Sequence, residues 1–294
     1  MTNTLLVTGI YAFEPGYPYY LHGGNSRFWR YVYSLIQISK CGLDIKCYTS
    51  SSLSSKLIDK FSEYNITNIE VRVKELNDTE HNKRALEIRE KHLDKFKCYY
   101  ELGQYKMYFI KENYLPEYDY IYWIDAGLSH RGLYPDKYNS NIELATGFAE
   151  CEYQYTYDKI YNKELFNKIN KWVGDKLLDI RNTSQYHSNK IMNEIFGNHH
   201  FYRSNAIGGL FGGYKDKIEH LIREFEVNSE KCLTKEHLLD HEAILTPIAI
   251  NNPEWFKTFT FNTWYHEDTD QDWVTDEFFN DYISFYKFFE TINK

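Results

Sequence analysis

The chain has 294 residues, of which 43% are hydrophobic and 18% aromatic, so it carries enough apolar material for one large core, and disorder is not expected. Its net charge of -8 and pI near 5.8 argue against a general nucleic-acid binder, which would present a basic face to the phosphates. No run approaches about 18 uninterrupted apolar residues, and no basic segment precedes Leu5-Leu6-Val7, so we expect neither a membrane span nor a signal peptide.

The five cysteines are scattered through the chain without a CxxC pair, which favours reduced and mostly buried thiols. Together with the missing signal peptide, this predicts a cytoplasmic protein. Peripheral association with the inner face of a membrane is left open.

The first half of the chain alternates strand and helix patterns. Apolar, β-branched runs predict strands over residues 4–10, 42–49 and 69–73, with a serine cluster at 50–55 after the second. Helical periodicity predicts helices over residues 27–40, 57–64, 78–100 and 105–113. This order implies an open α/β sheet, in which ligands bind beyond the carboxyl ends of the strands.

The middle of the chain, residues 139–200, is rich in Tyr, Asn and Lys and only weakly patterned, with helices predicted over 163–173 and 188–196. No repeat or low-complexity linker interrupts the sequence. We therefore expect one continuous domain over residues 1–294.

Residues 118–127, with the sequence Tyr-Asp-Tyr-Ile-Tyr-Trp-Ile-Asp-Ala-Gly, predict a buried strand that ends on the carboxylate of Asp125. A carboxylate at such a position loses hydration, so it requires a metal ion, a strong donor or an opposite charge. Asp125 is therefore a candidate metal ligand. The alternative is that Asp-Ala-Gly simply forms a tight turn.

A glycine-rich segment follows at residues 205–213, where Gly208-Gly209 and Gly212-Gly213 are separated by an apolar pair. Glycines let the backbone approach a ligand such as a sugar closely, although a bulged strand or a tight strand crossing would also require them. The segment fits neither a phosphate-binding P-loop nor a dinucleotide-binding fingerprint.

Residues 238–245 predict a short helix that closes at Thr246-Pro247, with Asp240 and Glu242 near its polar boundary. Two neighbouring carboxylates can divide their roles, one acting as a base or charge stabiliser while the other binds a hydroxyl. Acidic residues in a first helical turn also simply favour the helix dipole.

The segment 263–272 places Trp264 and His266 before a group of acidic residues. This combination could complete a divalent-metal site or contact a diphosphate. A solvated acidic loop with a structural histidine is the alternative.

Taken in chain order, these features resemble the GT-A class of nucleotide-sugar glycosyltransferases. Residues 125–127, Asp-Ala-Gly, look like a degenerate form of the Asp-x-Asp metal motif of that class, and residues 207–213 are similar to the glycine-rich acceptor-side strand of the blood-group-type and β-galactosyltransferases. The sequence Asp240-His-Glu242-x-x-Leu245 resembles the acidic segment of the blood-group-type enzymes, and His266 matches a C-terminal metal-binding histidine.

The likeness extends to the bacterial HtrL/YibB-like group, through Leu-Val-Thr-Gly at residues 6–9 and Trp-Ile-Asp-Ala-Gly at residues 123–127. One departure is Gly127, which stands where the metal motif has a second aspartate. Another residue, His130 or His266, would then complete the coordination of a metal.

The resemblance implies a GT-A-like open mixed sheet, with residues 1–135 as the nucleotide-sugar-binding half and 136–294 as the acceptor and catalytic half. It implies a divalent cation, Mn2+ or Mg2+, held on the diphosphate by Asp125 and His266. The residues implied to bind the UDP- or GDP-sugar donor are Thr8, Gly9, Tyr11, Lys106, Asp125, Ala126 and Gly127. Tyr11 could instead belong to the core, and Lys106 could be a solvated helix lysine.

On the acceptor side, the resemblance implies contacts with a glycan or lipid-linked glycan, in the synthesis of a surface polysaccharide or glycoconjugate. The residues implied to form these contacts are Gly208, Gly209, Gly212, Gly213 and Trp264. Glu242 occupies the catalytic carboxylate position, and either it or Asp240 would activate the acceptor hydroxyl or stabilise the cationic sugar.

Two other functions compete with this hypothesis. A metal-dependent phosphoester hydrolase or phosphotransferase would use Asp125, His130, His266 and Asp268. A non-catalytic carbohydrate-binding protein would stack some of the 28 tyrosines and 6 tryptophans on sugar faces, but would not require an acid at a strand end.

Overall fold

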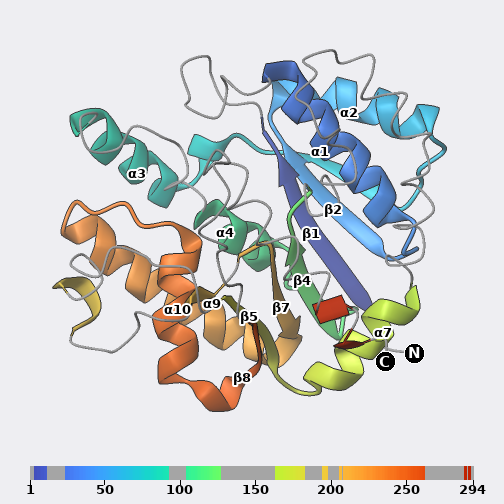
Figure 1. The fold of residues 1–294 in the computed structure, drawn as a ribbon. Coiled ribbons are helices and arrows are strands. Elements are labelled where there is room, and N and C mark those ends of the chain that lie inside the picture. The colour runs from blue at the N-terminus through green and yellow to red at the C-terminus, as the bar shows by residue number, and fades with distance from the viewer. Residues whose placement is uncertain are drawn as a thin grey trace, which may run out of the picture.

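The computed structural model describes residues 3–11, 24–92, 104–126, 163–182, 194–197, 205–206, 208–261, 288–289 and 291–292. Within these residues the chain builds an eight-stranded mixed sheet. Its strands are β1 (Thr4–Ile10), β2 (Asp44–Thr49), β3 (Ile69–Val73), β4 (Tyr120–Ile124), β5 (Leu177–Asn182), β6 (Asn205–Ala206), β7 (Leu210–Tyr214) and β8 (Phe256–Phe261). This confirms the predicted fold class, an open α/β sheet flanked by helices (Figure 1).

The strand order is β3-β2-β1-β4-β7-β5-β6, and β8 pairs with β5. Strands β1 to β4 are mutually parallel, whereas β7 is inserted antiparallel between β4 and β5. Because β7 is antiparallel to both of its neighbours, β5 runs in the same direction as β4, and β8 is parallel to β5. The carboxyl ends of β1, β2, β4, β5 and β8 therefore share one edge of the sheet, the edge at which α/β folds bind ligands.

Helices cover both faces of the sheet. Figure 1 shows α1 (Gly24–Ser39), α2 (Ser51–Glu63) and α7 (Lys163–Val173) on one face. The other face carries α4 (Tyr105–Glu112), α9 (Lys215–Thr234) and α10 (His241–Asn251), and α3 (Glu80–Lys91) packs against α9. Short 3-10 helices span Leu76–Asp78 and Pro253–Trp255. None of the helices in the described ranges combines the length and the apolarity needed to cross a bilayer.

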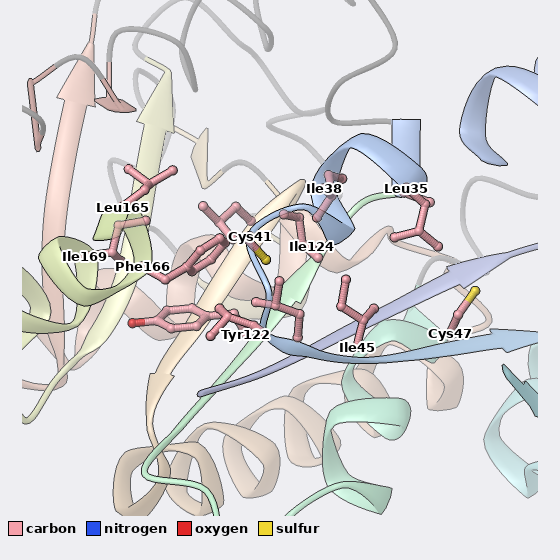
Figure 2. Close-up of a cluster of buried hydrophobic side chains, with 14 of the residues drawn as sticks. Leu35, Ile38, Cys41, Ile45, Cys47, Tyr122, Ile124, Leu165, Phe166 and Ile169 are labelled. Atoms are coloured by element: carbon pink, nitrogen blue, oxygen red, sulfur yellow. The ribbon is translucent and has the colours of Figure 1, made fainter. Parts of the chain in front are cut away.

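Strand β4 supplies both apolar layers, because successive side chains of a strand point to opposite faces. Tyr122 and Ile124 join the core beneath α1, α2 and α7, part of which is shown in Figure 2. Ile121 and Trp123 join the core beneath α4, α9 and α10. All five residues of the strand are buried, as the aromatic run predicts.

Helix α2 begins at Ser51, six residues before the predicted start at residue 57. The reason is the spacing of its buried side chains, Leu53, Leu57 and Phe61, which recur every four residues and so form one helical face. The serine cluster therefore belongs to the first turns of the helix and does not form a loop.

Two expectations about α10 are wrong. The helix does not close at Pro247 but continues to Asn251, and Asp240 and Glu242 lie in buried positions instead of at a polar boundary. An internal proline costs roughly 3 kcal/mol. Burial of several apolar side chains, including Ile244 and Ile248, stabilises the helix by about 1.5–3 kcal/mol each and outweighs that cost.

Candidate functional site

Asp125 directly follows β4 at the carboxyl edge of the sheet. Its Oδ1 accepts hydrogen bonds from Lys106 Nζ at 2.8 Å and from Trp123 Nε1 at 2.5 Å, and its backbone N–H donates to the Gly209 carbonyl at 2.8 Å. Both side-chain donors reach the same carboxylate oxygen, and the side chain is 40% exposed. Asp125 thus has the opposite charge and the strong donor that its position requires, and it still faces solvent.

Lys106 comes from α4 and is buried, so the alternative of a solvated helix lysine is wrong. Besides Asp125, its Nζ contacts the Gly208 carbonyl at 3.3 Å and His241 Nε2 at 3.1 Å, and it lies 5.4 Å from the centre of the Trp123 ring. An ammonium group has three N–H donors. The three acceptors, from three different parts of the chain, match all of them.

His241 is the site residue that the sequence analysis missed. An ammonium group donates only, so Nε2 of His241 must accept the hydrogen bond from Lys106, which places the proton of the neutral ring on Nδ1. The sequence feature that could have identified His241 is its position between Asp240 and Glu242. Its partner Lys106, however, is 135 residues away in the chain.

Gly208 fits beneath the His241 ring. A Cβ at residue 208 would lie 1.7 Å from His241 Nε2, so no other residue type can occupy this position without displacing the ring. The backbone N–H of Gly208 also donates to Glu242 Oε1 at 2.7 Å. The structure thus brings Gly208, Gly209 and Glu242 together with Asp125 and Lys106.

Asp240 and Glu242 lie at the start of α10 but make different contacts. The Oδ1 of Asp240 accepts a hydrogen bond from the Ala243 N–H at 2.7 Å, which makes Asp240 the N-cap of the helix. Glu242 instead faces the Gly208 backbone, and its carbonyl accepts from Thr246 Oγ1 at 2.8 Å.

The second glycine pair lies inside the sheet, in β7. Gly212 and Gly213 have φ values of +124° and +143°, and a Cβ on them would meet the Ile121 carbonyl oxygen at 2.3 Å and the Lys176 carbonyl oxygen at 2.5 Å, respectively. These glycines permit the close packing of β7 between β4 and β5, which is the tight strand crossing that the sequence analysis left open.

On the nucleotide side, Thr8 lies within β1 and is fully buried, and its Oγ1 has no hydrogen-bond partner among the described residues. Gly9 follows, and a Cβ there would meet the Tyr11 and Trp123 rings at 3.3 and 3.4 Å. The hydroxyl of Tyr11 donates to the Lys74 carbonyl at 2.9 Å, and burial raises its pKa.

Tyr11 is 8% exposed and belongs to the apolar cluster around Phe109. Ala126 is buried beside Asp125. Five further predicted residues lie outside the described part of the chain: Gly127, His130, Trp264, His266 and Asp268.

The described residues do not by themselves form a divalent-metal site. No group of three His, Cys, Asp or Glu side chains suited to a metal occurs among them. Lys106 Nζ already occupies one side of Asp125 Oδ1, and a cation could approach that oxygen only against the charge of the ammonium group. Further ligands of a metal on Asp125 would therefore come from residues outside the described ranges or from a bound substrate and water.

Comparisons with known proteins give structural similarities without a sequence family. No family model and no curated protein matches the chain. Among solved structures, it is similar to 4-diphosphocytidyl-2C-methyl-D-erythritol synthase from Anaerococcus prevotii, with a TM-score of 0.39, 11% identity, and 96% of this chain and 95% of that chain covered. It is also similar to a glucose-1-phosphate thymidylyltransferase from Bacillus anthracis, solved with sucrose, with a TM-score of 0.39, 9% identity, and 90% and 88% covered. At this similarity the two structures assign no reaction and no residue role to this chain.

Proposed function

We propose that the protein is a glycosyltransferase that moves a sugar from a UDP- or GDP-sugar to a glycan or lipid-linked glycan acceptor. The observation that carries this proposal is the convergence of Asp125, Lys106 and Glu242 around Gly208-Gly209 at the carboxyl edge of the sheet. Cleavage of a sugar–phosphate bond builds negative charge on the departing diphosphate and positive charge on the sugar. The ammonium group of Lys106 and the carboxylates of Asp125 and Glu242, all held at this glycine-lined backbone, suit both charges.

Lys106 is the cation that this proposal assigns to the diphosphate. Since three acceptors match its three N–H donors, a phosphate oxygen must replace one of them. The Gly208 carbonyl is the most easily replaced acceptor, because its 3.3 Å distance is the longest of the three and it carries no full charge. Asp125 and His241 would then hold the ammonium group in place while it faces the phosphate.

Glu242 is the carboxylate that we assign to the sugar or the acceptor. Its Oε1 is fixed by the Gly208 N–H, so the side chain is held at the glycine pair where the sugar would lie. In that position it can accept the proton of an acceptor hydroxyl or stabilise the cationic sugar. Asp240, in contrast, uses Oδ1 to cap α10, so Glu242 is the stronger catalytic candidate of the two.

A divalent cation, Mn2+ or Mg2+, remains part of the proposal through the pair Asp125 and His266. Strand β8 ends at Phe261 at the same sheet edge, and His266 follows in the chain. Five extended residues reach about 17 Å. Strand β8 is three strand spacings from β4, or about 14 Å, so the chain length between Phe261 and His266 is sufficient for the proposed pair. The cation would neutralise charge on the diphosphate, which Lys106 alone balances only in part.

The experiment is a screen of UDP- and GDP-sugars with the purified protein, in the presence of Mn2+, Mg2+ or a chelator, for release of nucleoside diphosphate and for thermal stabilisation. We expect at least one nucleotide sugar to be hydrolysed slowly without acceptor, and the Asp125→Asn and Lys106→Met variants to lose that activity. Arg223→Gln, an exposed change on α9, is the control and should retain it. If no nucleotide sugar is hydrolysed or stabilises the wild type under any of these conditions, the transferase proposal is wrong.

A further inference from the structure

Arg181 lies at the carboxyl end of β5, at the same sheet edge as Asp125. On the β4 side of β5, β7 pairs with the start of β5 and β6 pairs with its end, where Arg181 lies opposite Ala206. Asp125 contacts the Gly209 carbonyl, so one width of chain separates the two positions, and two strand spacings of about 4.8 Å place them roughly 10 Å apart.

Trp123 and Leu177 both belong to the core beneath α10. Asp125 lies two residues after Trp123, and Arg181 lies four residues after Leu177. Because side chains alternate along a strand, Asp125 and Arg181 face the same side of the sheet.

The guanidinium group of Arg181 is held by a buried carboxylate. Its Nε donates to Asp179 Oδ2 at 2.5 Å, and Thr258 Oγ1 donates to the same oxygen at 3.0 Å. The side chain of Asp179 is 1% exposed and that of Arg181 is 13% exposed. Asp179 therefore fixes the arginine from the interior side of the strand, while part of the arginine side chain remains accessible.

The contact through Nε determines what the arginine can still bind. Guanidinium has five N–H donors in a planar fork, and the contact with Asp179 uses the one on Nε. The two terminal amino groups are the donors that bind planar or tetrahedral oxyanions in a bidentate manner. A buried carboxylate behind an arginine pre-orients this fork, which reduces the entropy lost on binding.

The charge of the neighbouring site also favours a second cation. Among the described residues around Gly208, the carboxylates of Asp125, Asp240 and Glu242 stand against the single ammonium group of Lys106. An anionic substrate at this edge would meet repulsion without further positive charge. Arg181 supplies that charge roughly 10 Å from Asp125.

We propose that Arg181 binds a phosphate or carboxylate group of the substrate, on the acceptor side of the site. The position on the acceptor side depends on the proposed transferase function, but the binding of an oxyanion does not. The same oxyanion chemistry could come from the acceptor or from the diphosphate of the donor, and the choice of probes separates these sources.

The experiment measures binding of three probes by calorimetry: inorganic phosphate, glucuronate and UDP. The test variant is the double substitution Arg181→Gln with Asp179→Asn, which removes both charges together and leaves no unpaired buried charge. The matched control is Arg223→Gln with Glu219→Gln, which removes an exposed ion pair on α9. Arg181→Lys keeps the charge but removes the planar fork, and it serves as the second variant if the double variant does not fold.

We expect the test variant to bind phosphate and glucuronate at least about tenfold more weakly than the wild type, since a charged hydrogen bond contributes about 1.5–3 kcal/mol. The control should bind them as the wild type does, and Arg181→Lys should lose most of the affinity. Unchanged UDP affinity supports the acceptor-side position, whereas weakened UDP binding overturns that position and assigns the anion to the donor.

Two results overturn the proposal. The first is a wild-type protein that binds none of the three probes. The second is a test variant that binds all three probes as tightly as the wild type does, and Arg181→Lys takes the place of the test variant if the latter does not fold. Both differ from failure of the proposed function, which is the lack of nucleotide-sugar hydrolysis and stabilisation in the wild type.

Discussion

Replacing Gly208 with alanine tests whether the fit between this glycine and the His241 ring holds the site together. The added Cβ would lie 1.7 Å from His241 Nε2 and 2.2 Å from His241 Cδ2. Non-bonded heavy atoms pack at about 3.5 Å or more, so the ring or the backbone must move by nearly 2 Å. A movement of that size removes the 3.1 Å contact between Lys106 Nζ and His241 Nε2.

The expected loss of stability combines two effects. Overpacking costs about 1–3 kcal/mol, and loss of a hydrogen bond to a charged group costs about 1.5–3 kcal/mol, so Gly208→Ala should lower the free energy of unfolding by about 2.5–6 kcal/mol. Urea denaturation followed by circular dichroism measures this change. Gly42→Ala is the control, because Gly42 has a φ of +68° and no atom within 4 Å of its Cβ position. That variant should cost only the backbone strain of about 1–2 kcal/mol.

A double-mutant cycle with His241→Ala separates the clash from any other effect of the alanine. Without the imidazole ring, Gly208→Ala should cost less than about 1 kcal/mol, which gives a coupling energy of about 1.5 kcal/mol or more between the two positions. Equal costs of Gly208→Ala in the two backgrounds, within about 0.5 kcal/mol, would refute the reasoning, because independent sites are additive to that precision.

Two further predictions concern the surroundings of the site. Asp240→Ala should lower the free energy of unfolding, measured by urea denaturation, by about 1–2 kcal/mol, because the N-cap contact to the Ala243 N–H is lost. Asp240→Asn should retain most of the stability, since asparagine also caps helices. Equal losses in the two variants would contradict the capping role. Burial lowers the pKa of His81 from its ordinary value of 6.5, against the hydrogen bond from His81 to the Gln104 side-chain oxygen and the charge of Glu230, so the unfolded chain binds this proton more readily than the folded one. The resulting stability is complete above pH 6.5 and is lost as the pH falls below it. Lowering the pH from 7 to 5 should therefore lower the melting temperature of the wild type more than that of a His81→Asn variant, as measured by thermal denaturation. Equal decreases in the two proteins would exclude the effect.

Local sequence pattern predicted most elements that form the sheet edge. Strands β1 and β3 begin and end where the apolar runs do, and the aromatic run forms β4 and ends at Asp125. These predictions are confirmed because the periodicity of apolar side chains over a few residues indicates which face of a strand or helix is buried. The boundaries of α2 and α10 differ because tertiary packing decides where a helix begins and whether it passes through Pro247.

The candidate site was predictable as a set of segments but not as a set of contacts. Asp125, Lys106, Gly208 and Glu242 were all named from the sequence, and the structure brings them together. His241 was missed, although it lies in a segment that was already identified. His241 accepts a hydrogen bond from a lysine that is 135 residues away in the chain. The local sequence pattern does not distinguish such a histidine from a histidine that only fills space in the core.

Chain order and short-range pattern therefore establish that this protein has an α/β sheet, that one strand ends on a carboxylate, and that glycines and acidic residues follow later in the chain. The carboxylate is held by Lys106 of α4, which also contacts the 208–209 turn and the start of α10, and these segments meet where β7 is inserted antiparallel beside β4. Strand direction and long-range hydrogen bonds depend on how the whole chain packs, since each contact gains its energy only after distant segments have been brought together. Only the folded arrangement shows that Asp125 is paired with a buried lysine, and its role as a metal ligand stays a prediction.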